Sequence, residues 1–300
     1  MKSYLFPGTS LPMVIEASSS EYSSFDNLCA FVSKHSTELF SNLYRYGAIL
    51  FRGFAVTEVT QFETFAKLSV PKLTTYRGGD SPRHRVNRYI YTSTEFPAEY
   101  PIPLHNELSY SRRYPRLIFF FCYTPVARGG RTPLLDGRKL YKLLDSRIIE
   151  TFARKKLKYV QNLHAGIGFG KSWQDTFETD DREVVERHLR EVGAIAEWKS
   201  SGGLRVEEIV SPIIKHPVTG EKVFFSQADQ WHSSSLDEET RTGLLELISE
   251  NDLYHNCFYG DGSPLNPQDL DDIRYLSEQK KVCFSWQHGD LLIVDNRQPT

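Results

Sequence analysis

The chain has 300 residues, 40% of them apolar, and its 36 Lys and Arg residues against 38 Asp and Glu residues give a formal net charge of -2. This length and apolar content can bury one large core. The near-neutral charge excludes the excess of positive charge that nucleic acid or an anionic membrane surface would attract. We therefore expect a single domain over residues 1–300, with neither nucleic acid nor a membrane as partner.

Hydropathy and cysteine spacing indicate the compartment. The longest apolar runs, Ala48 to Phe51 and Leu117 to Cys122, are too short to cross a bilayer, and no basic segment followed by a long apolar one stands at the N-terminus. The cysteines form no C-x-x-C pair, which predicts reduced buried thiols rather than disulfides or a zinc site. They are Cys29, Cys122, Cys257 and Cys283. We expect a soluble protein located in the cytoplasm.

The first part of the chain predicts helices that pack outside a sheet. Apolar residues recur at helical spacing over residues 24–46, ahead of a short apolar strand at 48–51. A second helix is expected to start at Thr57, whose hydroxyl can cap it. Residues 76–103 are rich in Gly, Pro, Ser and Arg, so we expect loop there, apart from a strand at 89–92.

The rest of the chain mixes strands with helices. Further strands are predicted at 117–123, 158–163, 208–214, 222–225, 282–286 and 291–294. Further helices are predicted at 140–152, 181–192, 236–248 and 267–276, the last capped by Asn266. The sequence contains no glycine-rich strand-to-helix fingerprint of a dinucleotide-binding sheet, so the pattern favours a β-sandwich or barrel wrapped by helices.

The sharpest local motif is Leu104-His105-Asn106-Glu107, which follows the Pro-rich loop. In an extended backbone His105 and Glu107 project to one face, while Asn106 faces away. One imidazole and one carboxylate on a face supply two of the three ligands of the 2-His-1-carboxylate triad of Fe(II) oxygenases. Because the chain has nine histidines, such a tripeptide also arises by chance, and the alternative interpretation is a surface ion pair.

Other motifs accompany this one in a fixed order. After it come an apolar strand at 117–122, the turn Gly129-Gly130-Arg131-Thr132, and Trp286-Gln287-His288-Gly289-Asp290 leading into Val294-Asp295-Asn296-Arg297. This ordered set resembles the TauD/TfdA (taurine dioxygenase-like) family, especially its His-x-Glu branch that acts on amino acids or carrier-bound amino acids. The resemblance implies a mixed α/β fold with a mainly β core, the double-stranded β-helix or jelly roll with flanking helices. It also implies Fe(II), with 2-oxoglutarate and O2 as cosubstrates.

The resemblance carries roles to particular residues. It makes His105 and Glu107 iron ligands and the Thr132 hydroxyl a donor to a carboxylate of 2-oxoglutarate. In the family the distal histidine follows the aspartate of the Asp-Asn pair by six residues, which falls one residue past Thr300, and the arginine that holds 2-oxoglutarate lies further on. We expect the natural chain to continue past Thr300, because ending on an open core strand would leave backbone groups unpaired. The alternative is a truncated, inactive relative.

Four residues are candidates for contacts with the substrate. Arg83 precedes the metal motif and can hold a carboxylate through a bidentate fork, although a solvated loop arginine is an equal alternative. Gln227 and Trp231 belong to a stretch that lies near the substrate in the family, although an aromatic residue is also typical of a core. Asn106 completes the set.

The predicted function is hydroxylation, or another oxidation, of an unactivated C–H bond of an amino acid or an amino-acid-derived or carrier-tethered substrate, in the biosynthesis of an antibiotic or similar secondary metabolite. Glu107 as a ligand argues against halogenation, which needs a position for halide. Two other classes stay open. One is a jelly-roll binding protein that lacks the third iron ligand. The other is a zinc hydrolase around His105 and Glu107, which the lack of a helical H-E-x-x-H motif disfavours.

Overall fold

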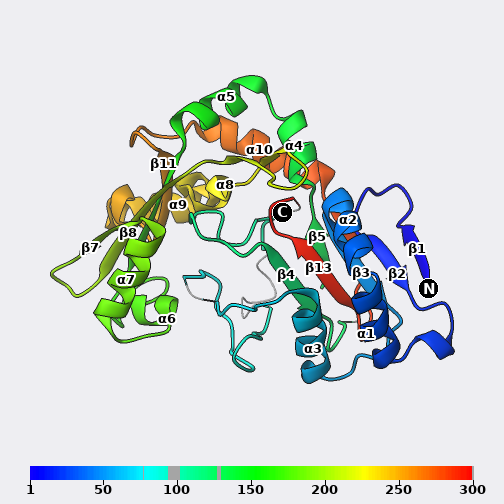
Figure 1. The fold of residues 1–300 in the computed structure, drawn as a ribbon. Helices are drawn as coiled ribbons and strands as arrows, with labels where there is room; N and C mark the ends of the chain where they lie inside the picture. Colours follow the sequence, from blue (N-terminus) through cyan, green and yellow to red (C-terminus); the bar gives the residue numbers. More distant parts are fainter. Residues whose placement is uncertain (77, 94–101, 127–129, 299–300) are drawn as a thin grey trace.

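The computed structural model of the chain describes residues 1–76, 78–93, 102–126 and 130–298. Its architecture is two β layers with helices on their outer sides (Figure 1). The larger sheet has the strand order β1-β2-β3-β13-β4. Its strands are β1 (Lys2–Leu5), β2 (Met13–Glu16), β3 (Ala48–Arg52), β13 (Leu291–Asp295) and β4 (Leu117–Phe121). Strand β13 lies between β3 and β4 and runs antiparallel to both.

Both faces of this sheet are covered, because its central strands are apolar at nearly every position. Ile49 pairs with Ile293 on one face, and Leu50 pairs with Leu292 on the other. The Ile49 face packs against helices α1 (Phe25–Lys34), α2 (Ser36–Tyr46) and α3 (Val59–Ser69). The Leu50 face packs against the two-stranded ribbon β5 (Thr132–Leu134) and β12 (Val282–Phe284).

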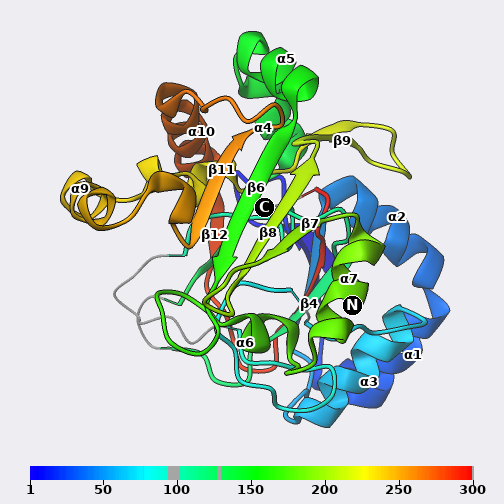
Figure 2. The same ribbon diagram turned by 90° about the vertical axis from the view of Figure 1, so that its left-hand side faces the viewer.

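The second sheet is antiparallel throughout, with the order β11-β6-β8-β7 (Figure 2). Its strands are β11 (His255–Tyr259), β6 (Leu157–Leu163), β8 (Leu204–Val210) and β7 (Ile195–Trp198). A hydrophobic core joins it to helices α4 (Gly137–Leu143), α5 (Ser146–Lys155), α8 (Ala228–Trp231) and α10 (Pro267–Lys280). A smaller core joins its other end to α6 (Trp173–Phe177) and α7 (Arg182–Val192).

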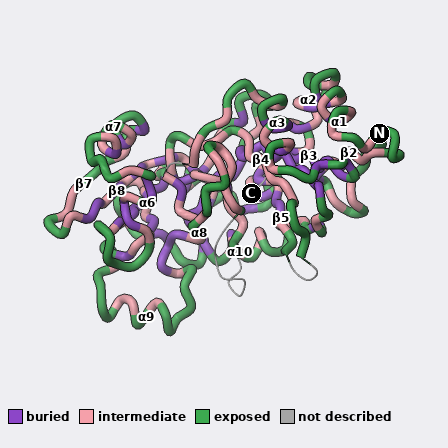
Figure 3. Tube along the Cα trace, turned by 90° about the horizontal axis from the view of Figure 1, so that it is seen from below, coloured by how far each residue is buried: buried purple, intermediate pink, exposed green. Residues whose placement is uncertain are grey.

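The remaining elements are peripheral. A ribbon of β9 (Ile213–Lys215) and β10 (Lys222–Phe224) packs on α4. Helix α9 (Glu238–Leu247) buries none of its residues, and Figure 3 shows it as an exposed arm. Short 3₁₀ turns cover Ser20–Tyr22, Ser233–Ser235 and Glu250–Asp252.

Several sequence predictions need correction. Two predicted helices are each split in two: residues 24–46 break at His35, and residues 140–152 break before Asp145, whose side chain caps α5. Helix α3 begins one residue later than a Thr57 cap implies, because Glu58 and Gln61 form a reciprocal capping box. The strand predicted at 89–92 is a single bridge between Arg85 and Tyr91.

The predicted strand at 208–214 is also two strands, β8 and β9, interrupted at Ser211-Pro212, where proline has no N–H to donate. The mixed α/β fold with a mainly β core is confirmed, since most pairings in both sheets are antiparallel. All four cysteines are free thiols, but only Cys257 is buried, which corrects the expectation of buried thiols for the other three. Within the described parts of the chain, no helix has the length and apolar character needed to span a membrane.

Candidate metal centre

The segment that carries the predicted iron ligands runs between the two sheets (Figure 1). On one side Asn296, just after β13, binds it with three hydrogen bonds. Its Oδ1 accepts from the Glu107 N–H at 2.8 Å, and its Nδ2 donates to the carbonyls of Glu107 at 2.8 Å and Pro115 at 2.9 Å. Asn106 completes the clamp by donating from Nδ2 to the Asn296 carbonyl at 2.7 Å. The end of the central strand therefore sets the position of the metal motif.

This clamp assigns Asn106 a structural contact. Its side chain is fully buried, while His105 and Glu107 on either side of it are only partly buried. The alternation predicted from an extended backbone is thus present, with the two ligand candidates on the opposite side from Asn106. The burial of Asn106 favours a positioning role over the predicted contact with the substrate.

His105 is oriented for a ligand through its Nε2 atom. Its Nδ1 lies 2.9 Å from the carbonyl oxygen of Pro103, to which it donates when it carries the ring proton. A metal-binding histidine commonly donates its other ring N–H to a backbone carbonyl in this way, which fixes the tautomer and the ring orientation. Sequence reasoning could not find Pro103 as this partner, although the residue stands two positions away.

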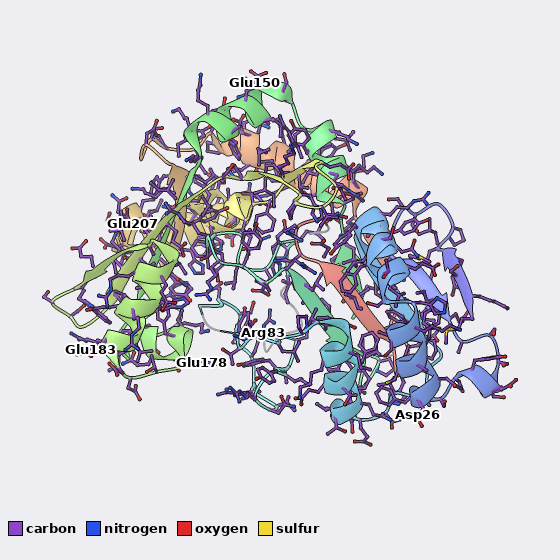
Figure 4. The ribbon with its side chains drawn as sticks, in the orientation of Figure 1. Asp26, Arg83, Glu150, Glu178, Glu183 and Glu207 are labelled. Carbon is purple, nitrogen blue, oxygen red and sulfur yellow. The ribbon has the colours of Figure 1, made fainter. Side chains whose placement is uncertain are left out.

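Glu107 is paired with Arg83, a residue from the loop that precedes the motif. Arg83 Nη2 lies 2.8 Å from Glu107 Oε2, and both side chains are more than four-fifths buried. The guanidinium also stacks over the Tyr76 ring, 4.1 Å from its centroid. Figure 4 shows Arg83 between the two sheets rather than on the outer surface. The alternative interpretation of Arg83 as a solvated loop residue is therefore wrong.

Helix α8 packs against the other side of the motif. Gln230 donates to the Leu104 carbonyl, and Ser109 Oγ donates to Gln227 Oε1 at 3.0 Å. The side chain of Asp229, on the same helix, is buried. Burial raises the pKa of Asp229 to about 6, opposed by Arg274 and His105. No sequence signal pointed to Asp229, because an acid on a four-residue helix looks like a surface residue.

The other residues predicted to contact cosubstrate or substrate have the following neighbours. Thr132 begins β5, and its Oγ1 accepts from the Trp286 indole N–H at 2.8 Å; among the described residues its own O–H has no acceptor. Trp231 lies in an aromatic stack, with its ring centroid 3.9 Å from that of His255 and 4.4 Å from that of Tyr110. Gln227 and Trp231 are both buried.

Three other histidines, His216, His232 and His288, use ring nitrogens for contacts within the protein. His216 is fully buried, with Nε2 donating to Asp295 at 2.9 Å and Nδ1 accepting from the backbone N–H of Thr219 at 3.1 Å. Both ring nitrogens are used, so its role is structural. His232 caps the following turn through Nδ1, and His288 contacts the Tyr123 carbonyl.

The two ligand candidates are donor types that suit Fe(II). His105 presents its Nε2, which has no partner among the described residues, and Glu107 presents a carboxylate, and these are two of the ligand types of a non-haem iron site. Over the described ranges, no three or more His, Cys, Asp or Glu residues gather around one point that could hold a metal. His105 and Glu107 remain predicted ligands.

Comparison with known proteins finds one matching family model and two similar relatives. The family model "Taurine catabolism dioxygenase TauD, TfdA family" matches residues 9–298. The dapdiamide synthesis protein DdaC of Enterobacter agglomerans is 31% identical over 250 residues, which cover 83% of this chain and 75% of the relative. A clavaminate synthase-like protein of Arabidopsis thaliana is 29% identical over 268 residues, covering 85% of this chain and 77% of the relative.

A solved structure also aligns with most of the chain. It is the crystal structure of AAD-2 in complex with Mn(II) and N-oxalylglycine, with a TM-score of 0.46 and 16% sequence identity. The alignment covers 89% of this chain and 79% of that one.

Proposed function

Since the chain belongs to the TauD/TfdA dioxygenase family, we propose that it oxidises an unactivated C–H bond of an amino acid or amino-acid derivative, with His105 and Glu107 as iron ligands. The observation that carries the proposal is the arrangement of these two residues. They share one side of a segment whose backbone is clamped by Asn296, and His105 has its Nδ1 anchored on a carbonyl.

Family membership confirms the predicted double-stranded β-helix and the predicted cofactors. The protein is an Fe(II)- and 2-oxoglutarate-dependent dioxygenase. Bound Fe(II), with 2-oxoglutarate and O2, supplies the oxidising power for C–H cleavage and releases succinate and CO2. The protein's own contribution is to hold the ligands, orient the cosubstrate and place one carbon of the substrate near the metal.

Residues around the site suit these tasks. The Thr132 O–H, which has no acceptor among the described residues, is available to a carboxylate of 2-oxoglutarate. Arg83 Nη2 binds Glu107 Oε2, so Oε1 of that carboxylate would be available to a metal ion. The Nε of Arg83 has no partner among the described residues and would be available to a carboxylate of the substrate, which is the role predicted for Arg83 from sequence.

The substrate class rests on the relatives. One is a dapdiamide synthesis protein and another is clavaminate synthase-like. We extend from them a role in the biosynthesis of a secondary metabolite, with the amino acid either free or tethered to a carrier protein. The cytoplasmic location also remains a proposal, supported by four cysteines that stay unpaired. So does the single dioxygenase domain over 1–300.

The test is to measure Mn(II) affinity, and succinate release from 2-oxoglutarate, in the presence of each of the common amino acids. It uses the natural full-length protein and its His105→Ala and Glu107→Gln variants. We expect one amino acid to stimulate succinate release, and each variant to lose both metal affinity and stimulation. His35→Ala, at the junction of α1 and α2, is the matched histidine control and should change neither.

A second function, that of a non-catalytic binding protein, is favoured by one observation: the Arg83 guanidinium already supplies Glu107 with a positive charge. If the full-length protein binds no Mn(II) at millimolar concentration while folding normally, the Arg83–Glu107 pair is permanent, and this alternative replaces the dioxygenase proposal.

A further inference from the structure

A small cavity lies beside the candidate metal centre, on the inner face of the second sheet. Its floor comes from neighbouring strands, where Tyr159 and Gln161 of β6 pair directly with Glu208 and Val206 of β8. The volume is about 40 Å³. A water molecule needs about 10–15 Å³ by this measure, so the cavity accepts a group the size of an alkylammonium terminus.

The cavity is close to the metal motif because the same segment lines both. Leu108 and Tyr110 line its wall, and they closely follow Glu107. Three residues of chain span at most about 11 Å, which limits the distance between the Cα atoms of Glu107 and Tyr110. Trp231, the last residue of α8, lines another wall.

Glu208 breaks an otherwise apolar row. The inward positions of β8 are Leu204, Val206, Glu208 and Val210, and all four are buried. A carboxylate in such a row loses hydration, and burial accordingly raises the pKa of Glu208. A sequence that places a charge where the fold favours an apolar residue marks a functional position more often than a structural one.

Glu208 has hydrogen bonds but forms no salt bridge among the described residues, although the charge of the nearby Arg112 acts on it. Its Oε2 accepts from Ser111 Oγ at 3.1 Å and from the Arg112 N–H at 3.0 Å, and no bond to Oε1 is formed within that part of the chain. The Arg112 guanidinium donates instead to the Ile209 carbonyl, at 3.2 Å. Arg113, which lines the outer part of the cavity, pairs with Glu191 at 3.2 Å.

Aromatic rings form part of the remaining wall, which Arg113 and His188 also line. The rings of Tyr110, Tyr159 and Trp231 pack on one another, with centroids 4.4 to 6.3 Å apart. Aromatic faces attract ammonium and guanidinium groups through the ring quadrupole. A buried carboxylate with aromatic neighbours is therefore a site for a positive charge.

We propose that this cavity holds a cationic group of the substrate, with Glu208 as its counter-charge, so that the substrate class is an amino acid with a positively charged side chain. This inference rests on the proposed function. It also gives Arg83 and Glu208 complementary roles in binding one substrate. Arg83 would take the carboxylate end of the substrate and Glu208 the cationic end. The loop from Gly78, which lines the cavity, to Arg83 connects them.

The test compares three probes, L-lysine, L-norleucine and L-glutamate, by calorimetry on the natural full-length protein with Mn(II) and N-oxalylglycine, where no turnover occurs. Norleucine has nearly the shape of lysine without its charge. We expect lysine to bind at least tenfold more tightly than norleucine, and Glu208→Gln to abolish that preference without weakening norleucine. Glu207→Gln is the matched control, because the adjacent Glu207 points to the other face of β8, and it should keep the preference.

Equal binding of lysine and norleucine, binding of none of the three, or a lysine preference that survives Glu208→Gln would each overturn the inference. Tighter binding of glutamate would assign the cavity to an anion through Arg113 instead. The lysine–norleucine comparison needs only the unaltered protein, so a misfolded variant does not leave the inference untested. A separate succinate assay with all amino acids tests the proposed function itself, because a lysine preference without succinate release would refute only that function.

Discussion

Two arginine–carboxylate pairs in this protein differ in how completely they are bonded. Arg52 and Asp290 form a double contact, with Nε to Oδ1 at 3.1 Å and Nη2 to Oδ2 at 2.7 Å. Arg52 also donates to the Ser285 carbonyl, and Asp290 accepts from the Gln287 N–H. Arg83 and Glu107 share a single contact at 2.8 Å, and within the described structure the buried Nε of Arg83 has no partner.

The difference distinguishes a structural ion pair from an ion pair whose bonds a ligand can replace. Removing either partner of the Arg52–Asp290 pair strands a buried charge, since the side chains are only 8% and 0% exposed. The Arg83–Glu107 pair leaves hydrogen-bonding capacity unused, which a metal ion and a substrate carboxylate can take up. Incomplete bonding in a buried pair is thus a sign of a ligand site.

The largest expected effect is on the structural pair. Asp290→Ala should lower the free energy of unfolding by about 3–5 kcal/mol, because it leaves Arg52 buried and unpaired. Urea unfolding measures this value. Asp261→Ala, which removes an exposed carboxylate paired with Lys155, is the control and should change stability by less than about 1 kcal/mol. Similar values for the two variants would show that burial does not distinguish these pairs.

Glu107→Gln should act on metal binding instead of folding. Loss of a ligand carboxylate exceeds the 10–100-fold effect of a supporting residue, so we expect Mn(II) affinity to fall by about 100-fold or more. Urea unfolding of the metal-free protein should stay within about 1 kcal/mol of the parent, because an amide still accepts from Arg83. Glu183→Gln on the exposed start of α7 is the control. Unchanged affinity would remove Glu107 from the ligand set.

Asn296→Ala should weaken metal binding, although Asn296 is not itself a ligand candidate. The change removes the bonds to Glu107 and Pro115, and we expect a fall in Mn(II) affinity of about 10- to 100-fold, as for other residues that support ligands. Asn162→Ala loses comparable bonds to backbone carbonyls in the second sheet. If both variants lower metal affinity equally, the effect is general destabilisation.

The smallest effect is expected for Arg83→Gln. Because the positive charge of Arg83 opposes a metal cation beside Glu107, its removal should raise Mn(II) affinity about fivefold, which corresponds to about 1 kcal/mol for a pair of this kind. Titration at low ionic strength measures it. Arg85→Gln, an exposed neighbour on the same loop, should leave affinity unchanged. A fall in affinity would mean that Arg83 supports the metal site.

The sequence predicted the parts of the fold that depend on local patterns. Apolar runs located β4, β6 and β13 to within one or two residues, and Asn266 with Pro267 located the start of α10. The break at His35 was missed because the apolar stripe continues in register from α1 into α2. Strands β1 and β2 were missed because most of β1 is exposed and both are only four residues long.

The candidate site was likewise predictable only where it depends on local patterns. His105 and Glu107 share a side because alternation is a local rule. The contacts that position them are long-range: Asn296 is 189 residues from Glu107, and Arg83 is 24 residues away. No spacing rule links such residues. The sequence predicted Glu208 only as part of a strand, because its proposed role depends on which side of β8 faces the cavity.

The Asn296 clamp also determines at which stage of folding the proposed metal site forms. The motif at 105–107 cannot adopt its final position until β13 has inserted between β3 and β4, and that strand is made some 170 residues after β4. Pairings of such high sequence separation form late and together with the rest of the fold. A partly folded chain therefore has no organised site for iron. Iron-dependent oxidation requires the complete fold.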